Sequence, residues 1–284
     1  MKNNIDQKWT AIIKPKTSLL TLNLKDIWRY KDLIKMFILR DFVASYKQTI
    51  LGPVWFIIQP LFTSGMFALI FGSIAQIPTD GVPTLLFYMT GVINWTYFSS
   101  CLGGTSNTFI GYAGMFGKVY FPRLTVPISV IIFNMLKYGI QYLIFIVVYF
   151  IFINKGYKPA YNWMILLTPV LLIYMALMGL GVGIWISSIT TKYRDLSFAF
   201  SFFVDLWMYA TPVIYPLSII PEEYKIFMLF NPMAPVIELF RMGYLGTGTV
   251  SIEHILISVC ITFSVLLSGI IIFNRIERTF MDTV

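Results

Sequence analysis

The sequence predicts an all-α polytopic membrane protein with six transmembrane helices, and two observations carry that prediction. Of the 284 residues, 57% are hydrophobic and only 12% are charged, a composition that a water-soluble fold could not solvate. In addition, six long stretches each carry at most one charge and reach the roughly 20 residues that a helix needs to cross a bilayer. We expect the spans near 51–76, 84–110, 126–153, 162–188, 196–215 and 254–274.

The positions of lysine and arginine predict the orientation of these spans. With the N-terminus inside, 16 of the 21 basic residues fall on the cytoplasmic side, four fall on the outer side, and Lys137 lies within a span. This asymmetry predicts that both termini are cytoplasmic. The net charge of +8 is therefore a topology signal. We expect no nucleic-acid partner, because no basic cluster is interleaved with a platform of aromatic residues.

Residues 1–49 are predicted to form a cytoplasmic segment that contains an amphipathic helix at the membrane interface. Between Asn23 and Tyr46, apolar residues recur at helical spacing and basic residues occupy the other faces, with Asn23 able to cap the start. The apolar positions are Ile27, Tyr30, Ile34, Phe37 and Ile38. Such a helix lies flat against membrane lipids. It can be a simple anchor or a lever that holds a cytoplasmic partner, and the residues leave both readings open.

Glycine and proline mark the turn into the first span and the packing of the fourth. Gly52 permits a tight turn and Pro53 suits a first helical turn, so the interface helix should bend sharply into a spanning helix. Pro60 should kink that helix. In the fourth span, Gly179 and Gly183 form a GxxxG pair, which is typical of close helix packing.

A short connection between Ala113 and Thr125 combines aromatic and basic side chains. The notable residues are Phe116, Lys118, Tyr120, Phe121 and Arg123. They can anchor the loop at the membrane interface, or they can form a peg that docks into another protein. Composition alone favours the anchor.

The region from Pro212 to Leu245 is predicted to form two re-entrant half-helices on the outer side. It is apolar, yet prolines interrupt it, notably in Asn231-Pro232. A full span here would also place the C-terminus on the wrong side of the membrane. Broken helices are tolerated at membrane depth where protein or a cavity surrounds them. The alternative is an outer loop with amphipathic helices at the surface.

Lys137 and Asp205 are the two charges that fall within predicted spans. Charges in such positions are costly and are usually functional. They can pair with each other, face a wet conduit, or form the proton relay of an ion-coupled secondary transporter. Two charges among six spans are few for coupled transport, so the relay is the less favoured alternative.

Signatures of enzymatic chemistry are missing from the sequence. It has no GxxxxGK[ST] phosphate loop, and its histidine, His254, stands beside Glu253 with no catalytic or metal-binding set, so we expect it at the surface. We therefore predict no catalytic residue, no metal and no bound cofactor. A membrane-bound lipid-modifying enzyme is disfavoured for the same reason. If the chain transports a cargo, the energy for transport must come from a partner or from an ion gradient.

Several motifs together resemble one family of membrane proteins. The run from Tyr46 to Trp55, followed by Gln59-Pro60, resembles the start of the first span in permeases of type-2 ABC exporters for polysaccharides. Residues 117–123 are similar to the first coupling loop of that family, and 192–195 to a later short loop. Residues 211–216 and 231–232 resemble its outer gate, and 273–282 its tail. The resemblance runs from about residue 25 to the end of the chain.

This resemblance implies a half-transporter in the bacterial cytoplasmic (inner) membrane. Two copies of a transmembrane domain at 50–276, each followed by a cytoplasmic tail at 277–284, would form a channel. Separate ABC ATPase subunits would bind ATP beneath it. The cargo would be an O-antigen-like or teichoic-acid-like polysaccharide carried on a polyprenyl-pyrophosphate lipid.

The resemblance also implies roles for particular residues. The five aromatic and basic residues of the loop at 113–125 would couple the chain to the ATPase, together with the interface helix. The substrate entrance would comprise Lys47, Leu51, Gly52 and Trp55, with Lys118 or Arg123 helping Lys47 to meet the pyrophosphate. Anionic membrane lipids suit these basic residues at least as well. The outer gate would comprise Pro212, Tyr215, Pro216, Asn231 and Pro232.

Overall fold

The computed structural model describes residues 24–47, 49–191, 193 and 195–283, and every regular element in those ranges is a helix. This confirms the predicted all-α class. In chain order the elements are α1 (Leu24–Arg29), α2 (Lys31–Tyr46), η1 (Gly52–Val54), α3 (Trp55–Phe67), η2 (Ala68–Ile74), α4 (Thr84–Ser106), α5 (Thr108–Gly111), α6 (Ala113–Phe116), α7 (Thr125–Asn154), η3 (Trp163–Leu167), α8 (Thr168–Thr190), α9 (Leu196–Tyr209), η4 (Leu217–Ile219), α10 (Glu222–Leu229), α11 (Ala234–Leu245) and α12 (Ile252–Thr283).

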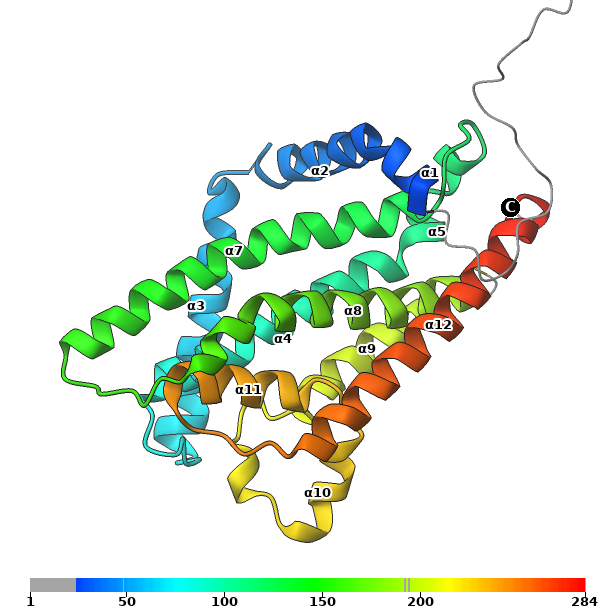
Figure 1. The fold of residues 1–284 in the computed structure, drawn as a ribbon. Coiled ribbons are helices and arrows are strands. Elements are labelled where there is room, and N and C mark those ends of the chain that lie inside the picture. The colour runs from blue at the N-terminus through cyan, green and yellow to red at the C-terminus, as the bar shows by residue number, and fades with distance from the viewer. Residues whose placement is uncertain (1–23, 48, 192, 194, 284) are drawn as a thin grey trace, which may run out of the picture.

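The predicted interface helix is present as two helices, α1 and α2, which are separated at Tyr30. Its apolar stripe faces protein, because Ile27, Ile34 and Phe37 are buried and α2 packs against α7. Asn23, the expected cap, lies outside the described residues. Figure 1 shows α2 at one end of the molecule and α10 at the opposite end. The two ends therefore present different surfaces.

The sharp turn predicted at Gly52 is also present. Gly52 has a φ of +52°, and a Cβ atom there would lie 3.3 Å from the Cβ of Tyr46. Both facts favour glycine, because it tolerates positive φ and adds no side chain. Pro53 occupies the first turn of η1, as expected. From there α3 runs through Pro60 and changes to a π-helix at Ala68.

The centre of the fold is a close contact between α4 and α8. A Cβ atom at Gly179 would lie 2.9 Å from the Cβ of Cys101, and one at Gly183 would lie 2.6 Å from the Cβ of Thr105. Side chains larger than hydrogen would push the helices apart, so the GxxxG pair is used as predicted.

The next glycine on α8 serves the opposite face of that helix. A Cβ atom at Gly181 would lie 3.0 Å from the backbone of Leu266 on α12, and one at Gly269 would lie 2.8 Å from the Gly181 carbonyl oxygen. Alternate glycines thus bring α8 into backbone contact with α4 on one side and with α12 on the other.

Four helical segments in the described part of the chain are long and apolar enough to cross a membrane. They are Gly52–Ile74, Thr125–Asn154, Trp163–Thr190 and Ile252–Ile276. A fifth helix, α4, has 23 residues but is less apolar. The sixth, α9, has 14 residues, which at about 1.5 Å per residue do not reach across a hydrocarbon core of about 30 Å. A polytopic membrane protein is confirmed, but the count of six spans is not.

Three predicted boundaries differ from the structure. The second span, expected to reach 110, is divided because α4 ends at Ser106 and α5 begins at Thr108. The fifth span, expected to reach 215, ends at Tyr209, shortly before Pro212. In contrast, α12 continues to Thr283 and passes the boundary at 276 that separated the last span from the tail.

The broken helix pair predicted on the outer side is clear. Helices α10 and α11 meet at an angle of 103° around a break of no more than four residues that contains Asn231-Pro232. Nearly all of α11 is buried in protein, including Val236, Ile237 and Phe240. Its helix ends are therefore surrounded by other parts of the chain, which is the setting in which broken helices are tolerated.

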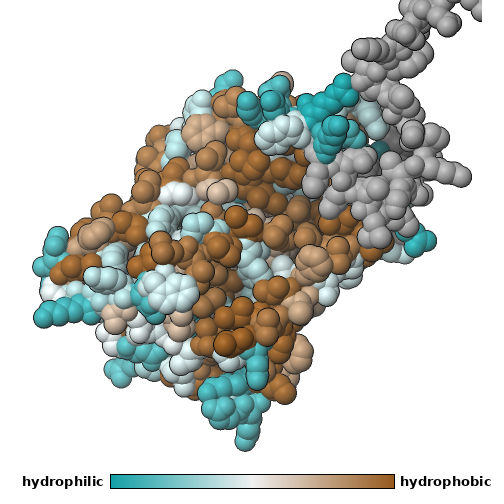
Figure 2. All heavy atoms as spheres, viewed as in Figure 1, coloured by the Kyte–Doolittle hydropathy of each residue, from teal (hydrophilic) through white to brown (hydrophobic). Residues whose placement is uncertain are grey.

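The outer surface of the bundle is largely apolar. Figure 2 shows hydrophobic residues over most of the visible face, with hydrophilic residues gathered toward the ends. Phe62, Leu166 and Phe198 are 70%, 78% and 81% exposed. Exposed apolar area of this extent is suited to lipid or to a second protein chain.

Candidate functional site

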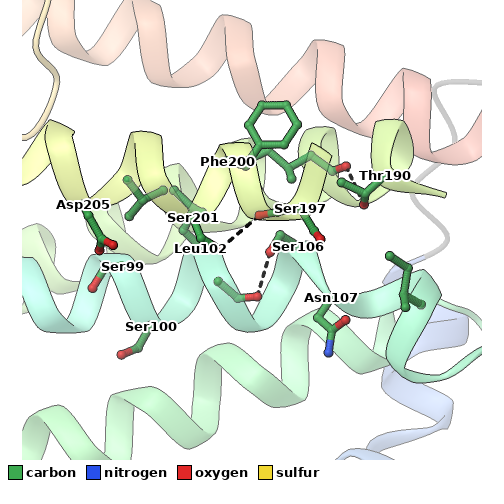
Figure 3. Close-up of a pocket in the computed structure, with 14 residues that line it drawn as sticks. Ser99, Ser100, Leu102, Ser106, Asn107, Thr190, Ser197, Phe200, Ser201 and Asp205 are labelled. Carbon is green, nitrogen blue, oxygen red and sulfur yellow. Dashed lines mark hydrogen bonds between the residues drawn. The ribbon is translucent and has the colours of Figure 1, made fainter. Parts of the chain in front are cut away.

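A polar cavity of about 490 Å³ lies between α4, α8 and α9. We call it the serine groove, and Figure 3 shows the side chains that line it. The polar residues among them are Ser99, Ser100, Ser106, Asn107, Thr190, Ser197, Ser201 and Asp205. The groove is more polar than the apolar exterior of the bundle, because hydroxyl, amide and carboxylate groups line it.

Helical periodicity explains how two separate helices supply this lining. On α9, Ser197, Ser201 and Asp205 are four residues apart and share one face, and on α4 the residues Ser99 and Ser106 are two turns apart. The α4 and α9 faces oppose each other, so Asp205 lies near Ser99 while Ser197 lies near Ser106 (Figure 3).

Hydrogen bonds in the groove mostly stay within one helix. The Ser99 hydroxyl donates to the Thr96 carbonyl at 3.2 Å, Ser106 donates to Gly103 at 2.8 Å, and Ser201 donates to Ser197 at 3.0 Å. Each hydroxyl proton thus points back to its own helix. The oxygen lone pairs remain available on the groove side.

Asp205 and Lys137, the two charges within predicted spans, occupy different surroundings. Asp205 is exposed and lines the serine groove. Lys137 lies on α7 with its Nζ atom 4.3 Å from the ring centre of Phe133 and 5.2 Å from that of Phe56. In the described structure the two residues form no ion pair with each other. The geometry that a direct relay between them would need is therefore missing.

Aromatic rings pack between α4 and α9 beyond the Asp205 end of the groove, next to its lining. Trp207 is two residues after Asp205 on α9, and its ring centre lies 6.0 Å from Trp95 and 5.2 Å from Phe98. The Trp207 indole also donates to the Asn231 side chain at 3.2 Å. A predicted gate residue therefore holds one ring of this cluster.

Asn231 connects the break between α10 and α11 to the end of α9. Its amide nitrogen donates to the Ala210 carbonyl and interacts with the Thr211 hydroxyl, both at 2.9 Å, and its amide oxygen accepts from the Met233 backbone at 3.1 Å. The neighbouring Pro232 carbonyl accepts from Ser258 on α12 at 2.9 Å. These bonds fix the break in the half-helix pair.

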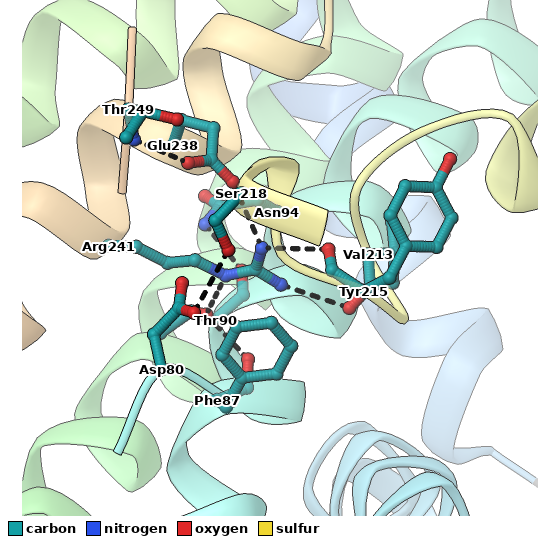
Figure 4. Close-up of polar contacts among 10 residues, drawn as sticks. All are labelled: Asp80, Phe87, Thr90, Asn94, Val213, Tyr215, Ser218, Glu238, Arg241 and Thr249. Atoms are coloured by element: carbon teal, nitrogen blue, oxygen red, sulfur yellow. Dashed lines mark hydrogen bonds and ion pairs between the residues drawn. The ribbon is translucent and has the colours of Figure 1, made fainter. Parts of the chain in front are cut away.

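A second set of bonds holds the segment 211–216, and we call it the outer network (Figure 4). Arg241 on α11 donates to the Val213 carbonyl at 3.0 Å, to the Tyr215 carbonyl at 3.4 Å and to the Thr90 hydroxyl at 3.3 Å. Its guanidinium carbon lies 3.7 Å from the ring centre of Phe87. One side chain thus joins α4, α11 and the segment after α9.

Glu238 balances the buried charge of Arg241. The two side chains are each 1% exposed, and they form an ion pair at 3.2 Å. Glu238 also accepts from the Thr249 backbone at 3.0 Å. A buried pair of this kind needs every partner, because removing one charge leaves the other uncompensated.

The predicted gate residues therefore lie close together, and most are buried. Pro212, Pro216, Asn231 and Pro232 are buried, while Tyr215 is half-buried and offers its carbonyl to Arg241. Sequence reasoning missed Glu238 and Arg241, and Arg241 was counted as an outer-loop charge. The available signal was two opposite charges three residues apart within an apolar stretch.

His254 and two of the five predicted coupling residues also differ from expectation in their burial. His254, expected at the surface, is 3% exposed. Phe116 and Phe121 are 7% and 4% exposed, and they belong to a cluster with Phe37, Phe109 and Phe273. They support the loop from inside and are not available to a docking partner.

The exposed tip of the same loop is Lys118, Val119 and Tyr120, of which Tyr120 is 72% exposed. Arg123 is half-buried, with its guanidinium carbon 5.4 Å from the ring centre of Phe116. The loop thus divides into a buried aromatic base and a projecting tip.

Arg40 ties α2 to this loop. Its guanidinium lies 5.0 Å from the ring centre of Tyr112 and hydrogen-bonds to the Tyr112 hydroxyl and to the Asp41 carboxylate. Burial alone would lower the pKa of Arg40, but these hydrogen bonds raise it above its ordinary value. The Arg40 side chain, which joins α2 to the loop, is therefore charged at any physiological pH.

The predicted entrance residues are exposed at the turn between α2 and α3. Lys47 is exposed, Leu51 is 41% exposed and Trp55 is 50% exposed, whereas Gly52 is buried and makes the turn. A basic, apolar and aromatic surface is thus presented at one corner of the bundle.

Residues 32–245 match the family model described as ABC-2 type transporter. The chain belongs to the ABC-2 type transporter family. The match begins in α2 and ends with α11, so it includes the serine groove, the loop at 113–125 and the outer network.

Relatives of this ABC-2 transporter chain match along most of its length. It is 29% identical over 255 residues to an O-antigen export system permease protein of Klebsiella pneumoniae, covering 88% of this chain and 94% of the relative. A second such protein of that organism is 27% identical over 253 residues, with the same coverage. A polysialic acid transport protein of Escherichia coli is 23% identical over 263 residues, covering 89% and 96%. Both kinds of relative handle polysaccharides.

Proposed function

We propose that this chain is the membrane-spanning permease subunit of an ABC exporter that moves a polysaccharide out of the cytoplasm. The cargo is an O-antigen-like or teichoic-acid-like polymer attached to a polyprenyl-pyrophosphate lipid, and a separate ATPase subunit supplies the energy. The observation that carries the proposal is the serine groove, a polar path within a bundle whose exterior is apolar. The polysaccharide export named for the relatives agrees with such a path.

The groove has the size and chemistry for sugar. Its volume of about 490 Å³ falls within the roughly 300–1,000 Å³ typical of small-molecule sites, which is far more than an ion needs. Hydroxyl oxygens on α4 and α9 can accept hydrogen bonds from sugar hydroxyls. One lipid-linked chain can therefore slide past a series of weak, similar contacts.

A second copy of the chain completes the conduit in this proposal. The groove is open on one side, and α9 presents Phe198, Phe202 and Phe203, all more than 60% exposed, next to it. A polar groove cannot face lipid without a large cost. A symmetric partner covers it and places two grooves face to face.

The ATPase docks at the cytoplasmic end, through α1, α2 and the tip at Lys118–Tyr120. Arg40 joins these parts, so a push on the tip is transmitted to α2 and then through the Gly52 turn to α3. Tyr120→Ala should therefore uncouple ATP hydrolysis from export. Tyr224→Ala is the matched control, because Tyr224 is also exposed but lies on α10 at the opposite end.

The lipid headgroup enters beside the turn. Lys47 offers positive charge to the pyrophosphate, while Leu51 and Trp55 offer an apolar and aromatic surface to the first isoprene units and sugar. Lys47→Ala should reduce stimulation of the ATPase by lipid-linked substrate more than it reduces basal hydrolysis. Lys158→Ala, another exposed lysine on the predicted outer side, should change neither.

The orientation and location follow from the distribution of charge. Both termini and the loop at 113–125 face the cytoplasm of a bacterium, and α10 faces outward across the inner membrane. In this setting the outer network lies on the outer side of the serine groove.

Reconstitution tests the proposal. The chain and an ABC ATPase from the same gene cluster are placed in vesicles with a polyprenyl-pyrophosphate-linked glycan, and ATP-dependent transfer is followed by the accessibility of the glycan to an added glycosidase. We expect transfer only with ATP and both subunits. Transfer at the full rate by this chain alone, driven by an imposed proton gradient, would show that it is an ion-coupled carrier.

A further inference from the structure

We propose that the serine groove selects a glycan that is neutral or carries amino groups, and that it disfavours polyanionic polymers. This inference rests on the proposed function and narrows it, because it favours an O-antigen-like neutral polymer over a teichoic-acid-like polyphosphate or a polymer of sialic acid. It comes from the donors, acceptors and charges that line the cavity.

The first observation is the direction of the hydrogen bonds. The hydroxyls of Ser99, Ser106 and Ser201 donate hydrogen bonds to carbonyls of their own helices. The Thr190 hydroxyl likewise donates to the Ile186 carbonyl at 3.0 Å. What these residues offer to a ligand is an oxygen lone pair. These four oxygens are therefore acceptors, and acceptors bind groups that carry protons, such as sugar hydroxyls and ammonium groups. The amide of Asn107, which also lines the groove, can donate as well as accept.

The second observation is the charge of the lining. Asp205 is the charged residue among the described residues of the groove, and an ionised carboxylate can only accept hydrogen bonds. It stands on the face of α9 that also carries Ser201, near Ser99 across the groove (Figure 3). A carboxylate or phosphate on the cargo would pass a like charge at this level, and the repulsion would be stronger where the proposed second copy covers the groove and excludes water.

The third observation is the position of Asp205 at one end of the groove. It lies two residues before Trp207, the ring that Asn231 holds against Trp95 and Phe98. A sugar unit that moves along the groove toward these rings therefore passes the carboxylate. A single charge on the path acts on each repeat of a long polymer, so a small preference per unit becomes a strong selection over the chain.

The relatives show that the distinction is meaningful. The family includes a polysialic acid transport protein, whose cargo has a carboxylate on every unit, and O-antigen export permeases. The acceptor oxygens of the lining and Asp205 place this chain with exporters of glycans that have few or no acidic groups.

The test measures binding to the permease–ATPase complex in nanodiscs, with two soluble probes of similar length. Maltoheptaose represents a neutral, hydroxyl-rich chain, and a heptamer of galacturonic acid represents a polyanion. The variants are Asp205→Asn, which keeps the shape and removes the charge, and Glu223→Gln, a matched loss of charge on exposed α10. Affinity is measured at low and at 0.5 M salt.

We expect the complex to bind the neutral heptamer at least tenfold more tightly than the acidic one at low salt, and the difference to shrink at high salt. Asp205→Asn should improve binding of the acidic heptamer about tenfold, and Glu223→Gln should leave both affinities unchanged. Tighter binding of the acidic probe, or an equal effect of Asp205→Asn on both probes, overturns the inference.

The same complex, assayed with lipid-linked glycans, separates the inference from the proposed function. If neither a neutral nor an acidic lipid-linked glycan is transferred with ATP, the proposed function fails, whatever the soluble probes show. If both are transferred at equal rates, export stands and the selection is refuted.

Discussion

The two ends of the bundle use polar groups in opposite ways. In the serine groove, hydroxyl groups bond within their own helices and leave the space between α4 and α9 open. In the outer network and at the neighbouring break between α10 and α11, Arg241 and Asn231 bond between elements, and they join α4, α9, α11 and the segment 211–216. Similar chemistry therefore makes a path at one end and a closure at the other.

This difference shows that the direction of the hydrogen bonds, within one helix or between elements, matters more than the number of polar groups. A hydrogen bond between elements fixes their relative position, whereas a bond within one helix leaves the helix free to separate from its neighbour. In the proposed exporter, we expect cargo to pass where the bonds are internal to helices. Passage at the far end would require the bonds of Arg241 or Asn231 to break, so we expect this end to control release.

Arg241→Leu should have the largest effect of these substitutions, because it removes the side chain that forms the outer network. It leaves Glu238 buried without its ion-pair partner and frees the carbonyls of Val213 and Tyr215, so we expect a loss of about 3–5 kcal/mol of stability. Thermal unfolding of the purified protein in detergent measures it. The double variant Glu238→Leu/Arg241→Leu should be less destabilised than the single one, and an equal or larger loss would show that the ion pair is not what makes Arg241 important.

Phe121→Ala tests whether the loop at 113–125 has a packed aromatic base. Phe121 belongs to the aromatic cluster with Phe37 and Phe116, and truncating a buried phenylalanine costs about 3–5 kcal/mol. We expect less folded protein in the membrane, measured by size-exclusion fluorescence. Tyr120→Ala, one residue away and exposed, should leave stability within about 0.5 kcal/mol. Similar losses for both would mean that the loop packs differently.

Asn231→Ala sharpens the comparison at the closed end. It removes the bonds to Ala210, Thr211 and Trp207, at a cost of about 1–3 kcal/mol. The readout is labelling of a cysteine introduced at Ile214 by a membrane-impermeant thiol reagent, with Cys260 replaced by serine. Because Ile214 is 4% exposed, labelling should be slow, and Asn231→Ala should accelerate it several-fold. Unchanged labelling would contradict the role of Asn231 in closure.

Lys137→Met should have the smallest effect, because Lys137 belongs to neither end. Its contacts are the rings of Phe133 and Phe56, and a cation–π contact contributes about 0.5–2 kcal/mol. Methionine keeps much of that packing, so ATP-driven export should continue near its normal rate. Abolished export with normal folding would revive the ion-coupled alternative.

Periodicity and proline positions predicted the parts of the fold that depend on local sequence. The apolar stripe at Ile27, Ile34 and Phe37, the turn at Gly52 and the break near Asn231 are all present. Each depends on residues within a few turns of each other, so neither the rest of the chain nor the membrane is needed to infer it.

The features that the sequence did not predict depend on which surfaces of the helices pack against each other in the folded protein. In a membrane protein both the core and the exterior are apolar, so composition did not reveal that Phe121 and His254 are buried while Phe198 is exposed. Arg241 was assigned to the outer loops by its charge, although it is the largest fully buried side chain among the described residues. The serines of α4 were recognised only as packing residues, because their alignment with α9 is a tertiary feature.

The alternate glycines of α8 determine which helices are held together most rigidly. Since Gly179 and Gly183 bring the α8 backbone against α4, and Gly181 brings it against α12, these three helices have no side-chain layer between them that can be compressed or repacked. They form a stiff frame. If the chain moves a cargo as proposed, we expect motion to fall on helices outside this frame, such as α9. The wall of the groove that carries Asp205 would then move relative to the wall that carries Ser99.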